Sequence, residues 1–141
     1  MRDMACWIES RVRVRYAETD QMGIVYHSNY FVWMEIGRVD FCRAKGILYR
    51  DMEAEGVLLV VAEVNCRYSS PAVFDEEVTI RTCIADVNPR MVRFEYELLH
   101  PDGKIVATGF TKHVYCSRER RPMKLPQKYW PTFGIVDPAQ I

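Results

Sequence analysis

The stretch of sequence that decides the fold leads from the end of a strand pattern to the start of a helix pattern. It reads Arg15-Tyr16-Ala17-Glu18-Thr19-Asp20-Gln21-Met22-Gly23-Ile24-Val25-Tyr26-His27-Ser28-Asn29-Tyr30. Just before it and at its start, residues 11–16 alternate between arginine and apolar side chains, which is the pattern of a half-buried β-strand. At its end, Asn29 offers a helix N-cap, because its side-chain oxygen can accept hydrogen bonds from the first helical turn. The stretch therefore predicts an acidic loop that carries Asp20 close to the N-terminus of a helix.

Residues 30–45 contain no proline and predict one long helix that ends near Gly46. At about 100° per residue, one stripe of this helix collects six positions, which are Tyr30, Trp33, Met34, Gly37, Phe41 and Ala44. Other apolar residues lie off the stripe, so we expect the helix to be covered on more than one side. Gly37 costs about 1 kcal/mol of helix stability relative to alanine, but it allows a sheet to approach the helix backbone closely.

The second half of the chain is patterned as strands. Residues 49–55 predict a second, short helix. Four apolar or alternating segments follow, at 57–68, 77–84, 92–98 and 105–116. Two turn signals separate the last three segments, Asn88-Pro89 and Pro101-Asp102-Gly103. A strand, a long helix and a four-stranded meander predict an α+β domain in which one antiparallel sheet curls over the helix. We expect the basic and then proline-rich tail from about residue 117 to be loosely packed.

Composition excludes several classes of function. The chain has 141 residues, which we interpret as one domain over 1–141, and its 19 basic and 19 acidic side chains give no overall field that attracts nucleic acid or an anionic membrane. No apolar run approaches the roughly 20 residues that span a bilayer, and the N-terminus lacks a signal-peptide pattern. We therefore expect a soluble, cytoplasmic protein. The five cysteines form no C-x-x-C pair and the histidines show no ligand spacing, so no metal site is expected.

Asp20 and His27 are the candidate catalytic residues. Backbone N–H groups at a helix N-terminus can stabilise the negative charge that develops on a carbonyl oxygen under attack, and those around His27 are the candidate donors. Asp20 could attack the carbonyl carbon directly or act as a general base on water, and the residues do not distinguish the two roles. Taken alone, a loop aspartate is more often a turn residue. Gly23 lets the loop bend tightly and lets the backbone approach a ligand.

The same stretch resembles a family signature. Hotdog-fold acyl-CoA thioesterases, of the 4-hydroxybenzoyl-CoA thioesterase family and of the bacterial Tol–Pal cluster, read approximately aromatic-x-x-Thr/Cys-Asp-x-x-Gly-hydrophobic-Val-aromatic-x-x-Asn-Tyr here. This chain supplies Tyr16, Thr19-Asp20, Gly23-Ile24-Val25-Tyr26 and Asn29-Tyr30. Further on, Pro71-Ala72 with Asp75 resembles the Pro-Ala-x-x-x-Asp element of the family. The resemblance extends from about Val12 to Leu125.

The resemblance implies a hotdog fold, an antiparallel sheet wrapped around one long central helix, and the hydrolysis of acyl-CoA to a free acid and CoA. It implies that the backbone N–H of His27 polarises the thioester opposite Asp20. Arg90 matches the place at which relatives present basic residues to the phosphates of CoA. The expected substrate-binding residues are Gly23, Tyr26, Asn29 and Arg90.

The resemblance implies no separate cofactor, because CoA is part of the substrate. We expect a homodimer or homotetramer, since one sheet on one helix leaves an edge and a face to cover. The alternative function is a hotdog module that binds acyl-CoA or an acyl carrier without hydrolysing it. Asp20 argues against that module, because a pure binder has little use for a carboxylate at a carbonyl site.

Overall fold

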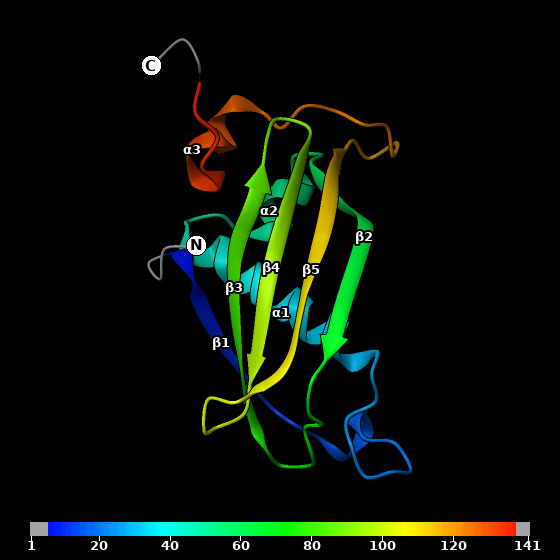
Figure 1. Cartoon of the computed structure of the whole chain (residues 1–141). Coiled ribbons are helices and arrows are strands. Elements are labelled where there is room, and N and C mark those ends of the chain that lie inside the picture. The colour runs from blue at the N-terminus through cyan, green and yellow to red at the C-terminus, as the bar shows by residue number, and fades with distance from the viewer. Residues whose placement is uncertain (1–5, 138–141) are drawn as a thin grey trace.

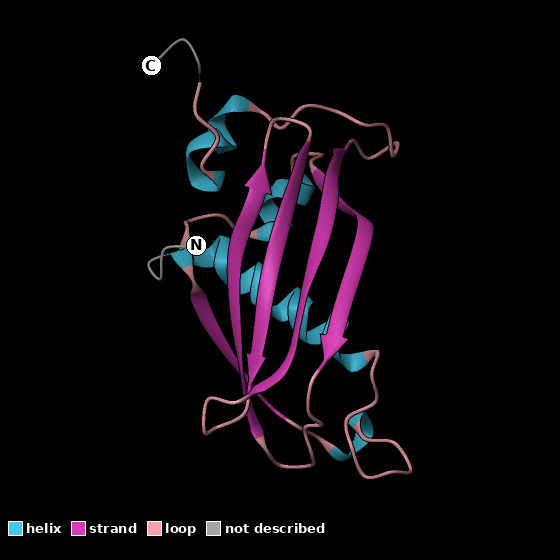
Figure 2. Cartoon of the chain, viewed as in Figure 1, coloured by secondary structure: helices cyan, strands magenta, loops and turns pink. Residues whose placement is uncertain are grey.

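The long helix packs obliquely against one face of a single antiparallel sheet (Figures 1 and 2). The computed structural model describes residues 6–137. The strands are β1 (Ile8–Arg13), β2 (Leu58–Tyr68), β3 (Glu77–Val87), β4 (Met91–Leu99) and β5 (Ile105–Cys116). The helices are α1 (Asn29–Ala44), α2 (Tyr49–Ala54) and α3 (Trp130–Phe133), and two short 3₁₀ turns span Tyr16–Glu18 and Gln127–Tyr129. The predicted helices and strands are present, and the α+β class is confirmed. The first strand, predicted at 11–16, instead ends at Arg13, because Tyr16 turns outward in a 3₁₀ turn.

The strand order is β1-β3-β4-β5-β2, and every neighbouring pair is antiparallel. The predicted meander is therefore correct for β3, β4 and β5 but wrong for β2, which pairs with β5 at the far edge. Short turns keep β3, β4 and β5 adjacent, as hairpins require. The longer connection 69–76 instead carries the chain from β2 across the end of the sheet to β3 (Figure 1). This connection runs beside the loop that holds Asp20, because Ile24 bridges to Val73.

The buried face of α1 follows the predicted stripe except at its last position. Ala44 is exposed, and Cys42 is buried instead. Gly37 is the point of closest approach to the sheet. A Cβ atom added at Gly37 would lie 2.3 Å from Thr82 Oγ1 and 2.9 Å from Ile80 Cγ2. The expected reason for a glycine in mid-helix is therefore confirmed.

The segment after β5 packs against the core. Leu125, Tyr129 and Phe133 are buried within the same apolar cluster as α1 and the sheet. The Leu125 N–H also donates to the carbonyl of Pro89 over 2.9 Å. The expectation of a loosely packed tail from about residue 117 is therefore wrong for 125–133, because these apolar side chains are buried in the core, while residues 118–122 are exposed.

The five cysteines are all free thiols, and Cys42, Cys83 and Cys116 are buried. Small apolar side chains of this kind fill core positions without forming a covalent link. Among residues 6–137, none of the helices combines the length and the apolar character that crossing a bilayer requires.

Candidate active site

Glu18 organises the loop between β1 and α1, and the sequence analysis did not single it out. Its side chain is buried, with Oε2 accepting from Trp33 Nε1 at 3.0 Å and Oε1 accepting from the Arg15 N–H at 2.8 Å. Burial alone would raise the pKa of Glu18, but these hydrogen bonds and the Arg15 guanidinium outweigh it and hold the pKa below its usual value. The sequence shows only that Glu18 is an acidic residue in the loop before an apolar helix, and this does not by itself predict that it is buried.

The backbone of Glu18 fixes the start of α1. Its carbonyl oxygen accepts from the Tyr26 N–H at 2.8 Å and from Asn29 Nδ2 at 2.9 Å. The predicted N-cap role of Asn29 is therefore wrong: Ser28 occupies the N-cap position, no side chain caps the helix, and Asn29 is the first helical residue. Its amide turns back and donates to the loop, which leaves the first N–H groups of the helix without a capping side chain.

Asp20 closes a tight turn and still keeps one carboxylate oxygen available. Oδ1 accepts from the Met22 N–H at 2.9 Å, and the Asp20 carbonyl accepts from the Gly23 N–H at 3.0 Å. Gly23 has a φ of +79°, in the left-handed region that glycine adopts at least cost. Oδ2 receives no hydrogen bond from any described residue. The Asp20 side chain therefore stabilises the turn with one carboxylate oxygen and leaves the other oxygen free to react.

Asp20 and His27 line the same cavity, which has a volume of about 290 Å³. Its other lining residues are Met22, Ile24, Val25, Tyr30, Tyr68, Ser69, Ser70 and Pro71. Within residues 6–137, the N–H groups of His27 and Ser28 donate no hydrogen bond, and they immediately precede α1. The cavity thus collects a carboxylate and the free N–H groups of a helix N-terminus, which is the combination that attack on a carbonyl needs.

Tyr68 and Tyr26 hold His27 from two sides. The Tyr68 hydroxyl donates to the His27 carbonyl at 3.1 Å, and the Tyr26 ring packs against the imidazole with ring centres 4.4 Å apart. Burial raises the pKa of Tyr68 to about 12, so its hydroxyl stays protonated and remains a donor at neutral pH. The peptide that carries the Ser28 N–H, next to the His27 N–H, is therefore fixed by a side chain from β2.

Arg90 does not join these residues within one chain. It is exposed in the turn between β3 and β4, at the end of the sheet opposite the Asp20 loop (Figure 1). The register sets Met91 beside Val114, and Val114 beside Val60. Tyr68, which lines the cavity, lies eight residues beyond Val60 along β2. At about 3.3 Å per residue, the cavity is therefore about 25 Å from the level of Arg90.

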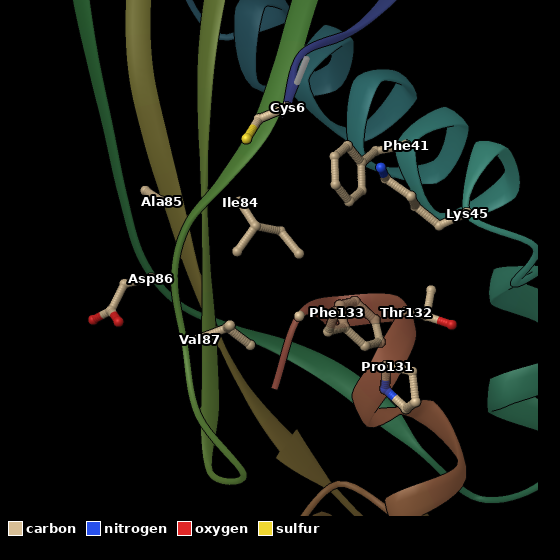
Figure 3. A pocket seen from close by; sticks show the side chains of 11 residues that line it. Cys6, Phe41, Lys45, Ile84, Ala85, Asp86, Val87, Pro131, Thr132 and Phe133 are labelled. Carbon is tan, nitrogen blue, oxygen red and sulfur yellow. The ribbon is translucent and has the colours of Figure 1, made fainter. Parts of the chain in front are cut away.

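A larger hollow, of about 770 Å³, lies between the C-terminal end of α1, β3 and α3 (Figure 3). Phe41 and Lys45 point into it from α1, and the Lys45 ammonium lies 5.5 Å from the centre of the Phe41 ring. None of the site residues predicted from the sequence lines this hollow. Among the residues that the structure describes, no group of three or more histidine, cysteine or acidic side chains is placed to bind a metal. We therefore choose the smaller cavity as the candidate site, because it contains Asp20 and His27, although the other hollow is larger.

A five-stranded antiparallel sheet packed on one long helix is the architecture of a hotdog fold, and here Asp20 and His27 line one cavity at the start of that helix. Residues 14–131 match the family model described as the thioesterase-like superfamily, and the chain belongs to that family. The predicted resemblance, the hotdog fold and the enzyme class, a thioester hydrolase, are thereby confirmed.

The relatives agree in class. The chain is 40% identical over 111 residues to the Bacillus subtilis protein named "Putative acyl-CoA thioesterase YneP", which covers 79% of this chain and 80% of that protein. It is 28% identical over 95 residues to the acyl-CoA thioester hydrolase YbgC of Escherichia coli O157:H7, covering 67% of this chain and 71% of YbgC. The crystal structure of the DHNA-CoA thioesterase from Staphylococcus aureus superposes with a TM-score of 0.85 at 29% identity, over 91% of this chain and 86% of that one.

Proposed function

We propose that this protein hydrolyses acyl-CoA thioesters to a free acid and CoA, with Asp20 as the catalytic carboxylate. The observation that carries the proposal is the shared cavity of Asp20 and the free N–H groups at the start of α1. Relatives that are named for acyl-CoA hydrolysis support the substrate class. The proposed reaction needs no cofactor beyond the CoA that the substrate itself carries.

The geometry supports a defined placement of the thioester. Its carbonyl oxygen accepts from the His27 N–H, where the dipole of α1 favours developing negative charge. Asp20 Oδ2 then attacks the carbonyl carbon, CoA leaves as the thiolate, and water hydrolyses the mixed anhydride. In the second route, Asp20 takes a proton from a water molecule that attacks the carbonyl carbon directly. Both routes use the one carboxylate oxygen that the turn leaves open.

We further propose that two copies pair along β2 and that Arg90 acts on the CoA phosphates of the partner's site. β2 is an edge strand that exposes Val60, Val61 and Val64, and an uncovered apolar edge favours pairing. Antiparallel pairing of two β2 strands brings the Tyr68 end of one copy beside the Leu58 end of the other. Each cavity then lies near the Arg90 end of the partner sheet, which removes the separation found within one chain.

The activity is tested by incubating the protein with aliphatic and aromatic acyl-CoAs and a thiol-trapping dye. We expect thiol release from the wild type and loss of most of it in Asp20→Asn, because the asparagine keeps the turn through Oδ1 but cannot attack or take a proton. Asp102→Asn is the matched control, since Asp102 holds a similar turn through the Lys104 N–H at 2.9 Å. No thiol release from any substrate, together with tight binding of acyl-CoA, would favour the non-hydrolytic binding module.

The pairing is tested by mixing two inactive or weakened variants. Asp20→Asn supplies an intact Arg90, and Arg90→Ala supplies an intact Asp20. If each cavity uses the partner's Arg90, mixed pairs contain one complete site and restore the wild-type KM. A mixture that behaves as the sum of its parts contradicts the shared site.

We also infer that the protein works in the cytoplasm, where its free thiols, including the exposed Cys6, stay reduced.

A further inference from the structure

Three polar side chains beside the cavity form a continuous hydrogen-bonded array that the proposed reaction does not use. His100 Nε2 lies 2.7 Å from Ser70 Oγ, and His100 Nδ1 is in short contact with Glu76 Oε2. Only 16% of the His100 side chain and 17% of the Glu76 side chain are exposed. Glu76 Oε1 accepts from the Val73 N–H at 3.1 Å, so both carboxylate oxygens are engaged. The array joins the hairpin between β4 and β5 to the connection 69–76.

The direction of these hydrogen bonds follows from counting protons. The Ser70 hydroxyl has one proton, and Ser70 Oγ lies 2.7 Å from the carbonyl oxygen of Ile105, which can only accept. Ser70 therefore donates to Ile105, and His100 Nε2 must donate to Ser70. His100 Nδ1 in turn donates to the Glu76 carboxylate. The ring then carries a proton on each nitrogen, and the negative charge of Glu76 balances it.

This array ends at the wall of the Asp20 cavity. Ser70 lines that cavity, and it also lines a second hollow on the outer side together with Glu76 and His100. With its proton given to Ile105 and one lone pair given to His100, Ser70 Oγ keeps one lone pair for a donor in the cavity. The connection that carries Ser70 also holds the Asp20 loop, because the Val25 N–H donates to the Ala72 carbonyl at 2.9 Å.

We propose that Glu76, His100 and Ser70 form a positioning relay for the thioester site, in which the first two fix the Ser70 hydroxyl as an acceptor at the cavity wall. The relay rests on the proposed function and adds a second fixed point to the helix N-terminus. It orients a donor of the bound substrate or the attacking water, so that the carbonyl carbon lies in line with Asp20.

Ser70 is a positioning residue here and not a nucleophile, although its partners resemble those of a serine hydrolase. A nucleophilic serine gives its proton to the histidine, whereas the Ser70 proton is held by Ile105. The neighbouring backbone offers no oxyanion donors either: the Ser70 N–H is bound by the Val106 carbonyl at 3.1 Å, and Pro71 has no N–H.

Steady-state kinetics with the best acyl-CoA test the relay. Ser70→Ala should lower kcat about tenfold and change KM less than threefold, because loss of orientation acts on the chemical step more than on binding. Glu76→Gln should produce a similar loss, since the amide cannot balance a ring with two protons. Ser70→Thr keeps the hydroxyl and should restore most of the rate. The double variant Ser70→Ala/Glu76→Gln should be no slower than either single variant, because the three groups act as a unit.

Ser117→Ala is the matched serine control, and we expect wild-type kinetics from it. Ring ¹⁵N spectra give a readout that needs no turnover: His100 should show two protonated nitrogens in the wild type and one in Glu76→Gln, with His100→Gln assigning the signals. A neutral His100 ring together with an unchanged kcat in Ser70→Ala overturns the relay but leaves the proposed function intact. A covalent acyl group on Ser70 after acid quenching also overturns it. A wild type that releases no thiol overturns the proposed function, and the relay falls with it.

Discussion

Substitution of Glu18 by glutamine tests whether one buried carboxylate holds the loop that carries Asp20. The change preserves volume but replaces one accepting oxygen by an NH₂ group. Two donors point at the carboxylate, Trp33 Nε1–H and the Arg15 N–H, and the amide can accept from only one of them. The other N–H group then faces the NH₂ group of the glutamine, and this buried donor has no acceptor.

The size of the effect follows from these two contacts. A hydrogen bond to a charged acceptor contributes about 1.5–3 kcal/mol, and a buried donor left unpaired costs a similar amount. We expect Glu18→Gln to lose about 2–3 kcal/mol of the free energy of unfolding. Trp33→Phe removes the indole donor and should lose less. In the double variant the two losses should not add, because the phenylalanine no longer needs an acceptor.

Urea denaturation followed by circular dichroism measures these losses at one protein concentration, so that self-association does not bias the comparison. The pKa of Glu18 is lowered on folding, so its contribution is full above its unfolded value of 4.5 and disappears as the pH falls through the folded value. The difference between wild type and Glu18→Gln should therefore be large at pH 7 and shrink in acid. A Glu18→Gln variant within 0.5 kcal/mol of wild type at pH 7 would refute this account of the loop.

Three further outcomes are expected. Arg90→Ala should raise KM for acyl-CoA and leave a short thioester without the nucleotide unaffected; equal effects on both substrates contradict a phosphate contact. Gly37→Ala should destabilise the fold by about 1–3 kcal/mol in thermal unfolding despite the better helix propensity of alanine, because its Cβ overlaps Thr82 Oγ1, and adding Thr82→Ala should recover part of the loss. Burial and the charge of Arg38 lower the pKa of His113 to about 4 from its usual 6.5, so the unfolded chain binds a proton that the folded chain refuses. As the pH falls from 6.5 to 4, stability should therefore fall by about 1.4 kcal/mol per pH unit. A His113→Gln variant with the same slope in that window refutes the assignment.

Local periodicity was sufficient to predict α1 and the strands β2 to β5, but it placed the first strand a few residues too late and did not predict α3. Alternation over 11–16 and the 100° stripe over 30–45 depend only on which face of a strand or helix is buried, and that face is set by neighbouring residues. Gly37 could be explained in advance for the same reason, because a glycine inside an apolar stripe needs a close partner. The edge position of β2 could not be predicted in this way. It depends on how far the connection 69–76 reaches, and a local pattern does not record that distance.

Which residues gather at the candidate site was predictable where a side chain's chemistry is unusual, and unpredictable where a common side chain can choose between two hydrogen-bond partners. Asp20 and His27 stood out as an acid and a histidine beside a helix start, and they share a cavity. Asn29 has a side chain that can either cap a helix or donate to a loop, and only the folded backbone decides between the two. Glu18 could not be singled out from the sequence, because the Trp33 indole that pairs with it lies fifteen positions away.

The free N–H groups of His27 and Ser28, just before α1, link these observations. A side-chain cap at position 28 would accept from the Tyr30 or Phe31 N–H, which already donate to the His27 and Ser28 carbonyls, so the His27 N–H that we assign to the thioester oxygen stays free with or without a cap. The loop is held from behind, by the Glu18 carboxylate on the Trp33 indole and by the Glu18 carbonyl on Asn29. The helix N-terminus therefore keeps free donors at the cost of burying one charge, and hydrogen bonds to that charge offset the cost. Ser28→Asp places a carboxylate at the N-cap beside the His27 N–H, so it should stabilise the helix through the helix dipole while lowering kcat, because it repels the negative charge that develops on the thioester oxygen; a variant that gains stability with undiminished kcat would show that the thioester oxygen does not lie at these N–H groups.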